Sequence, residues 1–253
     1  MPLYIFGSGK MALAIAKSLA KKEDLVIVGR DKDRLLEFQK KSGAKSITTY
    51  QELKNIDALE IIVAVKPYAI KELFSTLKGE AKAIYSVAAG FSIDALKSSV
   101  DAKGYIRVMP NVAASVQKSM TSISGDASLK QRACDIFSQI GQTMWFEKES
   151  MIDVSTPIAG SSPAFLAVVA EALIDGAVKE GLDRDSATKL VQGSFEGFAE
   201  TLKHRTPSEI KNEVMSPAGT TAEGIYELEK GGVRAAFMSC VKSTFLKTKA
   251  LKG

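Results

Sequence analysis

The fold is decided by the first residues of the chain, Leu3-Tyr4-Ile5-Phe6-Gly7-Ser8-Gly9-Lys10-Met11-Ala12. An apolar run reaches Gly-x-Gly-x-x-Ala and continues into a helical pattern, which predicts a strand, a tight turn and a helix. In such a unit Gly7 permits the turn, Gly9 lets the backbone approach a pyrophosphate, and Ala12 allows the helix to pack closely on the sheet. The helix N-terminus would then offer unpaired N–H groups to the phosphates. The motif favours a dinucleotide-binding unit over a tight turn that binds nothing.

Up to about residue 150 the chain alternates short β-rich runs with helical patterns. Several of the runs are apolar on consecutive positions, as strands covered on both faces are. This alternation predicts an α/β fold with a parallel sheet and right-handed crossovers. The expected strands are 3–6, 25–28, 59–65, 83–87 and 106–109, with 121–123 and 143–146 as further candidates, and the expected helices are 11–20, 32–41, 70–77 and 129–140.

After residue 156 the strand signals almost stop and helical patterns take over, among them 165–179 and 233–249. The helix at 165–179 is apolar around much of its circumference, which points to cover by a second subunit. Two capping boxes are predicted, one from Thr206 to Glu209 and one from Thr220 to Glu223. We therefore expect a Rossmann-like dinucleotide-binding domain over 1–153, followed by an all-helical substrate-binding and dimerisation domain over 154–253.

The charge of the chain lies unevenly along the sequence. There are 34 basic and 29 acidic residues, and the whole excess falls within residues 1–155, which hold 22 basic and 17 acidic side chains. Because the basic residues are dispersed, they suit an anionic small ligand better than a nucleic acid. Two distant cysteines and a single histidine argue against a disulfide framework and against a His/Cys metal site. Neither a basic leader nor an uninterrupted apolar run of about 18 residues is visible, so we expect a cytoplasmic protein that does not bind a membrane. From the cysteine, histidine and charge patterns we also expect it to bind neither a metal nor a nucleic acid.

The choice of dinucleotide depends on the residues after the second strand, Gly29-Arg30-Asp31-Lys32. The acid that binds the ribose of NAD is missing at Gly29, whereas Arg30 and Lys32 suit a 2′-phosphate. The sequence therefore favours NADPH. NADH stays open, because Asp31 could accept from the ribose hydroxyls or could simply cap the next helix.

Further ordered motifs follow the phosphate loop along the chain. They are Ala64-Val65-Lys66-Pro67, Ala88-Ala89-Gly90, Arg107-Val108-Met109-Pro110-Asn111, Gly160-Ser161-Ser162-Pro163-Ala164-Phe165 and Met215-Ser216-Pro217-Ala218-Gly219-Thr220-Thr221. In these motifs the chain resembles the pyrroline-5-carboxylate reductases over essentially its whole length. It departs from the usual family pattern at Val112-Ala113, where Thr-Pro is common, and at Ala218, where Gly is common.

The resemblance implies the reduction of 1-pyrroline-5-carboxylate to L-proline by hydride transfer from NAD(P)H, the final step of proline biosynthesis. It also implies a homodimer or a larger ring of dimers. The substrate carboxylate would bind to the backbone of the 216–221 loop, and the Thr221 hydroxyl would contact the imine nitrogen as the catalytic group. The substrate-binding residues expected are Ser216, Ala218, Gly219, Thr220 and Thr221. The cofactor-binding residues expected are Gly7, Ser8, Gly9, Lys10, Met11, Arg30, Lys32, Ala64, Val65, Lys66, Pro67, Ala88, Ala89, Gly90 and Asn111.

Two other functions are compatible with a dinucleotide domain followed by helices. A β-hydroxyacid-dehydrogenase-like oxidoreductase would carry a lysine early in its first long helix, but residues 164–175 contain none and Lys179 comes late. A non-catalytic NADPH-binding regulator would bind the nucleotide without consuming it. Turnover with an imine separates both alternatives from the reductase.

Overall fold

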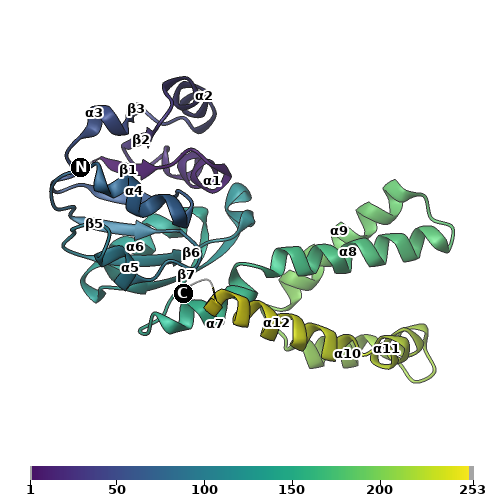
Figure 1. Ribbon diagram of the computed structural model, residues 1–253. Helices are drawn as coiled ribbons and strands as arrows, with labels where there is room; N and C mark the ends of the chain where they lie inside the picture. The colour runs from purple at the N-terminus through teal and green to yellow at the C-terminus, as the bar shows by residue number, and fades with distance from the viewer. Residues whose placement is uncertain (1, 251–253) are drawn as a thin grey trace. The chain divides into compact units, whose positions relative to one another are not determined.

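The structure is a computed structural model that describes residues 2–250. The described chain divides into two compact units, residues 2–163 together with 243–250, and Ala164–Lys242. The first unit holds the sheet and the second is helical (Figure 1). The helix that precedes the division, α7 (Ser150–Ala159), contacts strands of the sheet and so belongs to the first unit.

The sheet of the first unit has eight strands in the order β3-β2-β1-β4-β5-β6-β7-β8. All neighbouring strands are parallel except β6 and β7, which are antiparallel. The strands are β1 (Leu3–Phe6), β2 (Leu25–Gly29), β3 (Ser46–Thr49), β4 (Glu60–Val63), β5 (Ala83–Ser86), β6 (Tyr105–Met109), β7 (Ser119–Gly125) and β8 (Gly141–Trp145).

Helices cover both faces of this sheet, which explains why its strands are apolar on consecutive positions. On one face, Leu3 and Ile5 of β1 pack in a cluster with residues of α1 (Lys10–Leu19), α2 (Lys32–Ser42) and α6 (Lys130–Phe137). On the other face, Phe6 packs in a cluster with residues of α3 (Tyr50–Leu53), α4 (Ile70–Ser75) and α5 (Ile93–Lys97). The 3₁₀ segments are η1 (Pro67–Ala69), η2 (Val112–Val116), η3 (Ala127–Leu129) and η4 (Ser138–Ile140).

Three local features differ from the sequence prediction. Strand β3 was not expected, because Ser46-Ile47-Thr48-Thr49 is a short edge strand in which only Thr49 is buried. Strand β7 runs antiparallel to β6, because the intervening chain is short and contains only η2, whereas a parallel return needs a crossover of about a dozen residues or more. The helix expected at 129–140 is divided into η3, α6 and η4.

The second unit is built from helices, as predicted. They are α8 (Ser162–Lys179), α9 (Arg184–Thr201), α10 (Pro207–Val214), α11 (Thr220–Lys230) and α12 (Val233–Ala250), of which α8 and α12 extend beyond the unit's limits. The capping box at Thr206 is present: its hydroxyl accepts from the Glu209 N–H, and the Glu209 carboxylate accepts from the Thr206 N–H.

The apolar side chains of these helices are largely exposed in a single chain. No residue of α8 is buried within the described structure, and Val168 is 65% exposed. By length and composition alone, Ser150–Lys179 could cross a membrane, but a single segment of this kind is weak evidence for a membrane span. Several exposed apolar side chains on one helix indicate a surface that another surface covers.

Candidate active site

The carboxyl ends of the parallel strands bring most of the predicted cofactor residues to one edge of the sheet. The order of the strands reverses between β1 and β4, because β2 and β3 lie on one side of β1, and β4, β5 and β6 lie on the other. In open α/β sheets a ligand binds in the crevice at such a point, outside the carboxyl ends of the strands. The loops that meet there contain residues 7–9, 30–32, 64–67, 88–90 and 111.

The turn after β1 depends on Gly7. Its φ is 120°, and a Cβ atom there would lie 2.7 Å from the carbonyl oxygen of Ala64, in the loop after β4. The backbone is further fixed by the Gly7 N–H, which donates to Val28 O at 2.9 Å, and by the Ala64 N–H, which donates to Phe6 O at 2.8 Å. Gly7 therefore allows the loops after β1 and β4 to touch.

Gly9 has a different role. It is the N-cap of α1 with φ −81°, and outside its two neighbours in the chain no described atom lies within 4 Å of the position that its Cβ would occupy. Among the described residues, no side chain caps α1, and its first turn contains no acid. The partial positive charge of this ten-residue helix thus faces open space over Gly9, which is suited to a pyrophosphate.

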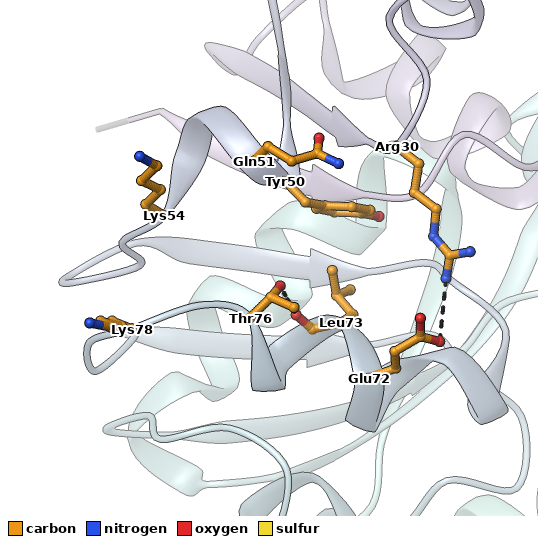
Figure 2. A pocket seen from close by; sticks show the side chains of 8 residues that line it. All are labelled: Arg30, Tyr50, Gln51, Lys54, Glu72, Leu73, Thr76 and Lys78. Carbon is orange, nitrogen blue, oxygen red and sulfur yellow. Dashed lines mark hydrogen bonds and ion pairs between the residues drawn. The ribbon is translucent and has the colours of Figure 1, made fainter.

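The polar residues after β2 contact other groups of the chain, and of the two roles left open for Asp31 the structure shows the helix cap. Asp31 caps α2, because its Oδ1 accepts from the Arg34 N–H at 3.0 Å. The Arg30 guanidinium lies 3.8 Å from a carboxylate oxygen of Glu72, and the Lys32 ammonium lies 3.4 Å from Glu52. Both predicted phosphate-binding cations therefore face a carboxylate (Figure 2 shows the first pair).

A hollow of about 680 Å³ begins beside this pair. Figure 2 shows the Tyr50 ring between Arg30 on one side and Lys54 on the other. Burial raises the pKa of Tyr50 to about 12, although the charge of Arg30 opposes this shift, so the phenol stays neutral at physiological pH. The hollow is lined by Arg30, Tyr50, Gln51, Lys54, Glu72, Leu73, Thr76 and Lys78.

Asn111, at the end of β6, is buried and already hydrogen-bonded. Its Nδ2 donates to Ala159 O at 2.6 Å, and its Oδ1 accepts from the Ala113 N–H at 2.9 Å. The side chain thus ties the end of β6 to the end of α7. Because an Asn amide has two N–H donors, this contact leaves one donor for the role in cofactor binding predicted for Asn111.

A buried ion cluster also holds α7 against β6. Arg107 is fully buried; its Nη2 donates to Asp153 at 2.9 Å and its Nη1 donates to Glu149 at 3.1 Å. In the sequence, Arg107 stands out only as the first residue of the Arg107–Asn111 motif. Its partners lie 42 and 46 residues further along the chain, so no local pattern could have indicated them.

The predicted substrate loop precedes α11, and its cap differs from the expected one. The N-cap is Gly219, with φ −81° and ψ 162°, and Thr220 is the first helical residue, so the capping box predicted at Thr220 is wrong. The helix begins one residue earlier than expected, because the Gly219 N–H donates to Ser216 O at 3.0 Å and Gly219 has no side chain to contact Ser216. Within the described chain no side chain caps α11, so neither threonine hydroxyl is used in capping it.

Ala218, the departure from the usual glycine, has a left-handed φ of 56°. This conformation costs an L-residue roughly 1–2 kcal/mol, which a glycine would not pay. The turn therefore forms in this chain despite the substitution.

A Gly-x-Gly-x-x-Ala loop at the switch point of a largely parallel sheet defines a dinucleotide-binding α/β protein. Comparison with known proteins is more specific. Residues 149–251 match the family described as pyrroline-5-carboxylate reductase dimerisation, and residues 3–90 match NADP oxidoreductase, coenzyme F420-dependent. The pyrroline-5-carboxylate reductase of Helicobacter pylori is 33% identical over 95% of this chain and 96% of its own.

Solved structures agree with these matches. A 1-pyrroline-5-carboxylate reductase from Streptococcus pyogenes superimposes with a TM-score of 0.89 at 32% identity, covering 99% of this chain and 98% of its own. A Plasmodium falciparum pyrroline carboxylate reductase with NADP bound gives 0.81 at 28% identity, covering 100% and 98%. The chain belongs to the pyrroline-5-carboxylate reductase family. The predicted family, α/β fold class and enzyme class, an NAD(P)H-dependent oxidoreductase, are confirmed, and the individual site residues stay predictions.

Proposed function

We propose that this protein reduces 1-pyrroline-5-carboxylate to L-proline, the final step of proline biosynthesis, with NADPH as the favoured hydride donor and NADH as an alternative. The observation that carries the proposal is the phosphate loop, in which Gly9 leaves the N-terminus of α1 open at the switch point of the sheet. Family membership supplies the substrate. The NADP bound in the Plasmodium relative supports the choice of cofactor class.

The chemistry needs few ionisable groups from the protein. When bound, the reduced nicotinamide supplies a hydride, which adds to the imine carbon while the C=N π electrons move to nitrogen. A protonated imine is already a good electrophile, and the proton stays on nitrogen in the product amine. The protein's task is then to hold donor and acceptor in attack geometry, which contributes up to about 7–11 kcal/mol in favourable cases.

The 216–221 loop has the features that this task requires. The eleven-residue helix α11 offers N–H groups at its start, and its positive end suits the substrate carboxylate. Thr221 lies in the first turn and is only half-buried. We assign its hydroxyl to the imine nitrogen.

The proposed assembly is a homodimer or a ring of dimers in the cytoplasm. It is supported by the dimerisation-family match over 149–251 and by the exposed apolar side chains of α8. A second copy would cover this surface without a membrane.

The test is oxidation of NADPH and NADH followed at 340 nm with and without 1-pyrroline-5-carboxylate. Imine-dependent oxidation is expected, and the ratio of kcat/KM values gives the cofactor preference. Thr221→Ala should lower kcat/KM for the imine roughly ten- to hundredfold, the loss expected for a hydrogen bond made to a charged group, and should leave the dissociation constant of NADPH within about twofold.

The matched control is Thr188→Ala, which removes a half-buried hydroxyl from α9. It should turn over the imine like the parent chain. Unchanged kinetics in Thr221→Ala would remove this residue from the site. Nucleotide binding without imine turnover by the parent chain would refute the reductase function and favour a regulator or a carbonyl substrate.

A further inference from the structure

The carboxyl edge of the sheet carries two cations and two carboxylates beside the proposed nucleotide site. Arg30 follows β2 and pairs with Glu72 of α4 at 3.8 Å, and Lys32 begins α2 and pairs with Glu52 of α3 at 3.4 Å. The four charges sum to zero. A 2′-phosphate that approaches Arg30 and Lys32 therefore meets nearby negative charge as well as positive charge.

The two carboxylates differ in what else they do. Glu52 belongs to a capping box, since it accepts from the Thr49 N–H at 2.8 Å and also from the Thr48 hydroxyl. Glu72 lies in the first turn of α4, its side chain is 75% exposed, and its ion pair is with Arg30. Its carboxylate can therefore respond to a ligand without unfolding a helix end.

We propose that Glu72 is a specificity-determining residue that weakens binding of the 2′-phosphate of NADPH and so narrows the preference for NADPH over NADH. This inference rests on the proposed function, because it concerns the nucleotide of that same site. Two effects act in the same direction. The carboxylate competes with the phosphate for the Arg30 guanidinium, and it repels a group that carries nearly two negative charges.

NADH lacks this penalty. Its 2′-hydroxyl is neutral and can donate a hydrogen bond to a carboxylate. The Glu72 charge acts equally on the pyrophosphate that both nucleotides carry, so only its effect on the 2′-phosphate changes the preference between them. Figure 2 shows the Glu72 carboxylate directed at Arg30, at one end of the hollow lined by these residues.

The test uses the whole chain and ligands that need no turnover. Dissociation constants of adenosine 2′,5′-bisphosphate and of AMP are measured by calorimetry for the parent chain and for Glu72→Gln, which keeps the size and removes the charge. For charges several ångströms apart in a solvated site, we expect affinity for the bisphosphate to rise roughly three- to tenfold at low salt and less at high salt, with AMP within about twofold. The ratio of kcat/KM for NADPH over NADH should rise by a similar factor.

Glu147→Gln is the matched control. It removes one exposed carboxylate from an ion pair with Lys130, after β8, whose carboxyl end lies at the opposite edge of the sheet. It should leave the bisphosphate-to-AMP ratio unchanged. An unchanged ratio in Glu72→Gln, or an equal change in Glu147→Gln, would overturn the inference.

The two proposals fail differently. If the imine is reduced but Glu72→Gln does not alter the ratio, the specificity role is wrong and the function stands. If both adenosine ligands bind and the ratio changes while the imine is not reduced, the function is wrong and the role of Glu72 stands. If neither ligand binds the parent chain and the imine is not reduced, both are wrong.

Discussion

Replacing Gly7 and Gly9 by alanine separates the architectural role of the phosphate loop from its ligand-binding role. In Gly7→Ala the new methyl would lie 2.7 Å from Ala64 O and 2.9 Å from Ala64 C, and the φ of 120° is strained for any L side chain. The obstacle is backbone in the loop after β4, so it cannot move aside as a side chain could. Backbone strain and overpacking together cost roughly 2–4 kcal/mol. The melting temperature should fall by roughly 5–15 °C.

Gly9→Ala places the same methyl in open space. The residue has φ −81°, and outside its two neighbours in the chain no described atom lies within 4 Å of the new Cβ, so the fold can accept alanine. Alanine restricts the unfolded chain more than glycine does, and this stabilises the folded protein by about 0.4–1 kcal/mol. The gain roughly offsets the lower preference of an N-cap position for alanine. The methyl would, however, occupy the space assigned to the pyrophosphate. Loss of hydrogen bonds to a charged group, worth about 1.5–3 kcal/mol, should weaken NADPH binding roughly ten- to hundredfold.

The assays are thermal unfolding by circular dichroism and calorimetric titration with NADPH. The expected pattern is an unstable Gly7→Ala and a stable Gly9→Ala that binds the nucleotide poorly. Wild-type affinity in Gly9→Ala would show that the pyrophosphate does not lie over this residue. A wild-type melting temperature in Gly7→Ala would refute the steric argument.

Two further predictions concern buried charges in the sheet unit. Arg107→Met removes the guanidinium that the buried carboxylate of Asp153 faces, and it should lower the free energy of unfolding in urea by about 3–5 kcal/mol. The control Arg184→Met breaks an exposed ion pair and should lower the free energy of unfolding by less than about 1 kcal/mol. Equal losses in the two variants would contradict this reasoning. Burial raises the pKa of Glu60, but the hydrogen bonds and charge of Arg132 outweigh burial and hold this pKa below its usual value. The contribution of Glu60 to the stability of the fold is therefore present above the unfolded pKa of about 4.3, and it is lost as the pH falls through the folded pKa. Glu60→Gln should therefore flatten the fall in melting temperature from pH 5 to pH 3, and a slope equal to that of the parent chain would show that Glu60 does not contribute.

Most of the sheet was predictable because its signals are local. The strands β1, β2, β4, β5 and β6 are apolar runs that end in turn residues, and each was expected close to its observed position. The sequence missed β3, since a four-residue edge strand with one buried residue has no apolar period to detect. It also could not give the direction of β7, because that direction depends on the short connection from β6 and on the pairing of β7 with β6.

The proposed site was predictable to a similar extent. Glycines and small residues at the ends of strands could be named because parallel strands end at one edge of a sheet. The position of the α11 cap was predicted one residue too late in the chain, because the Thr-x-x-Glu spacing from Thr220 to Glu223 is that of a capping box. The turn from Ser216 to Gly219 instead placed the cap at Gly219.

By itself the sequence determined the fold class, the family and the position of the glycine turn between β1 and α1, because these depend on periodicity and on short motifs whose residues are neighbours in the chain. Only the tertiary structure decided which charges meet. Arg30 faces Glu72 and Arg107 faces Asp153 across more than forty residues of sequence. An ion pair depends on the distance between two side chains in space, and that distance is set by the packing of helices on the sheet rather than by either residue's neighbours.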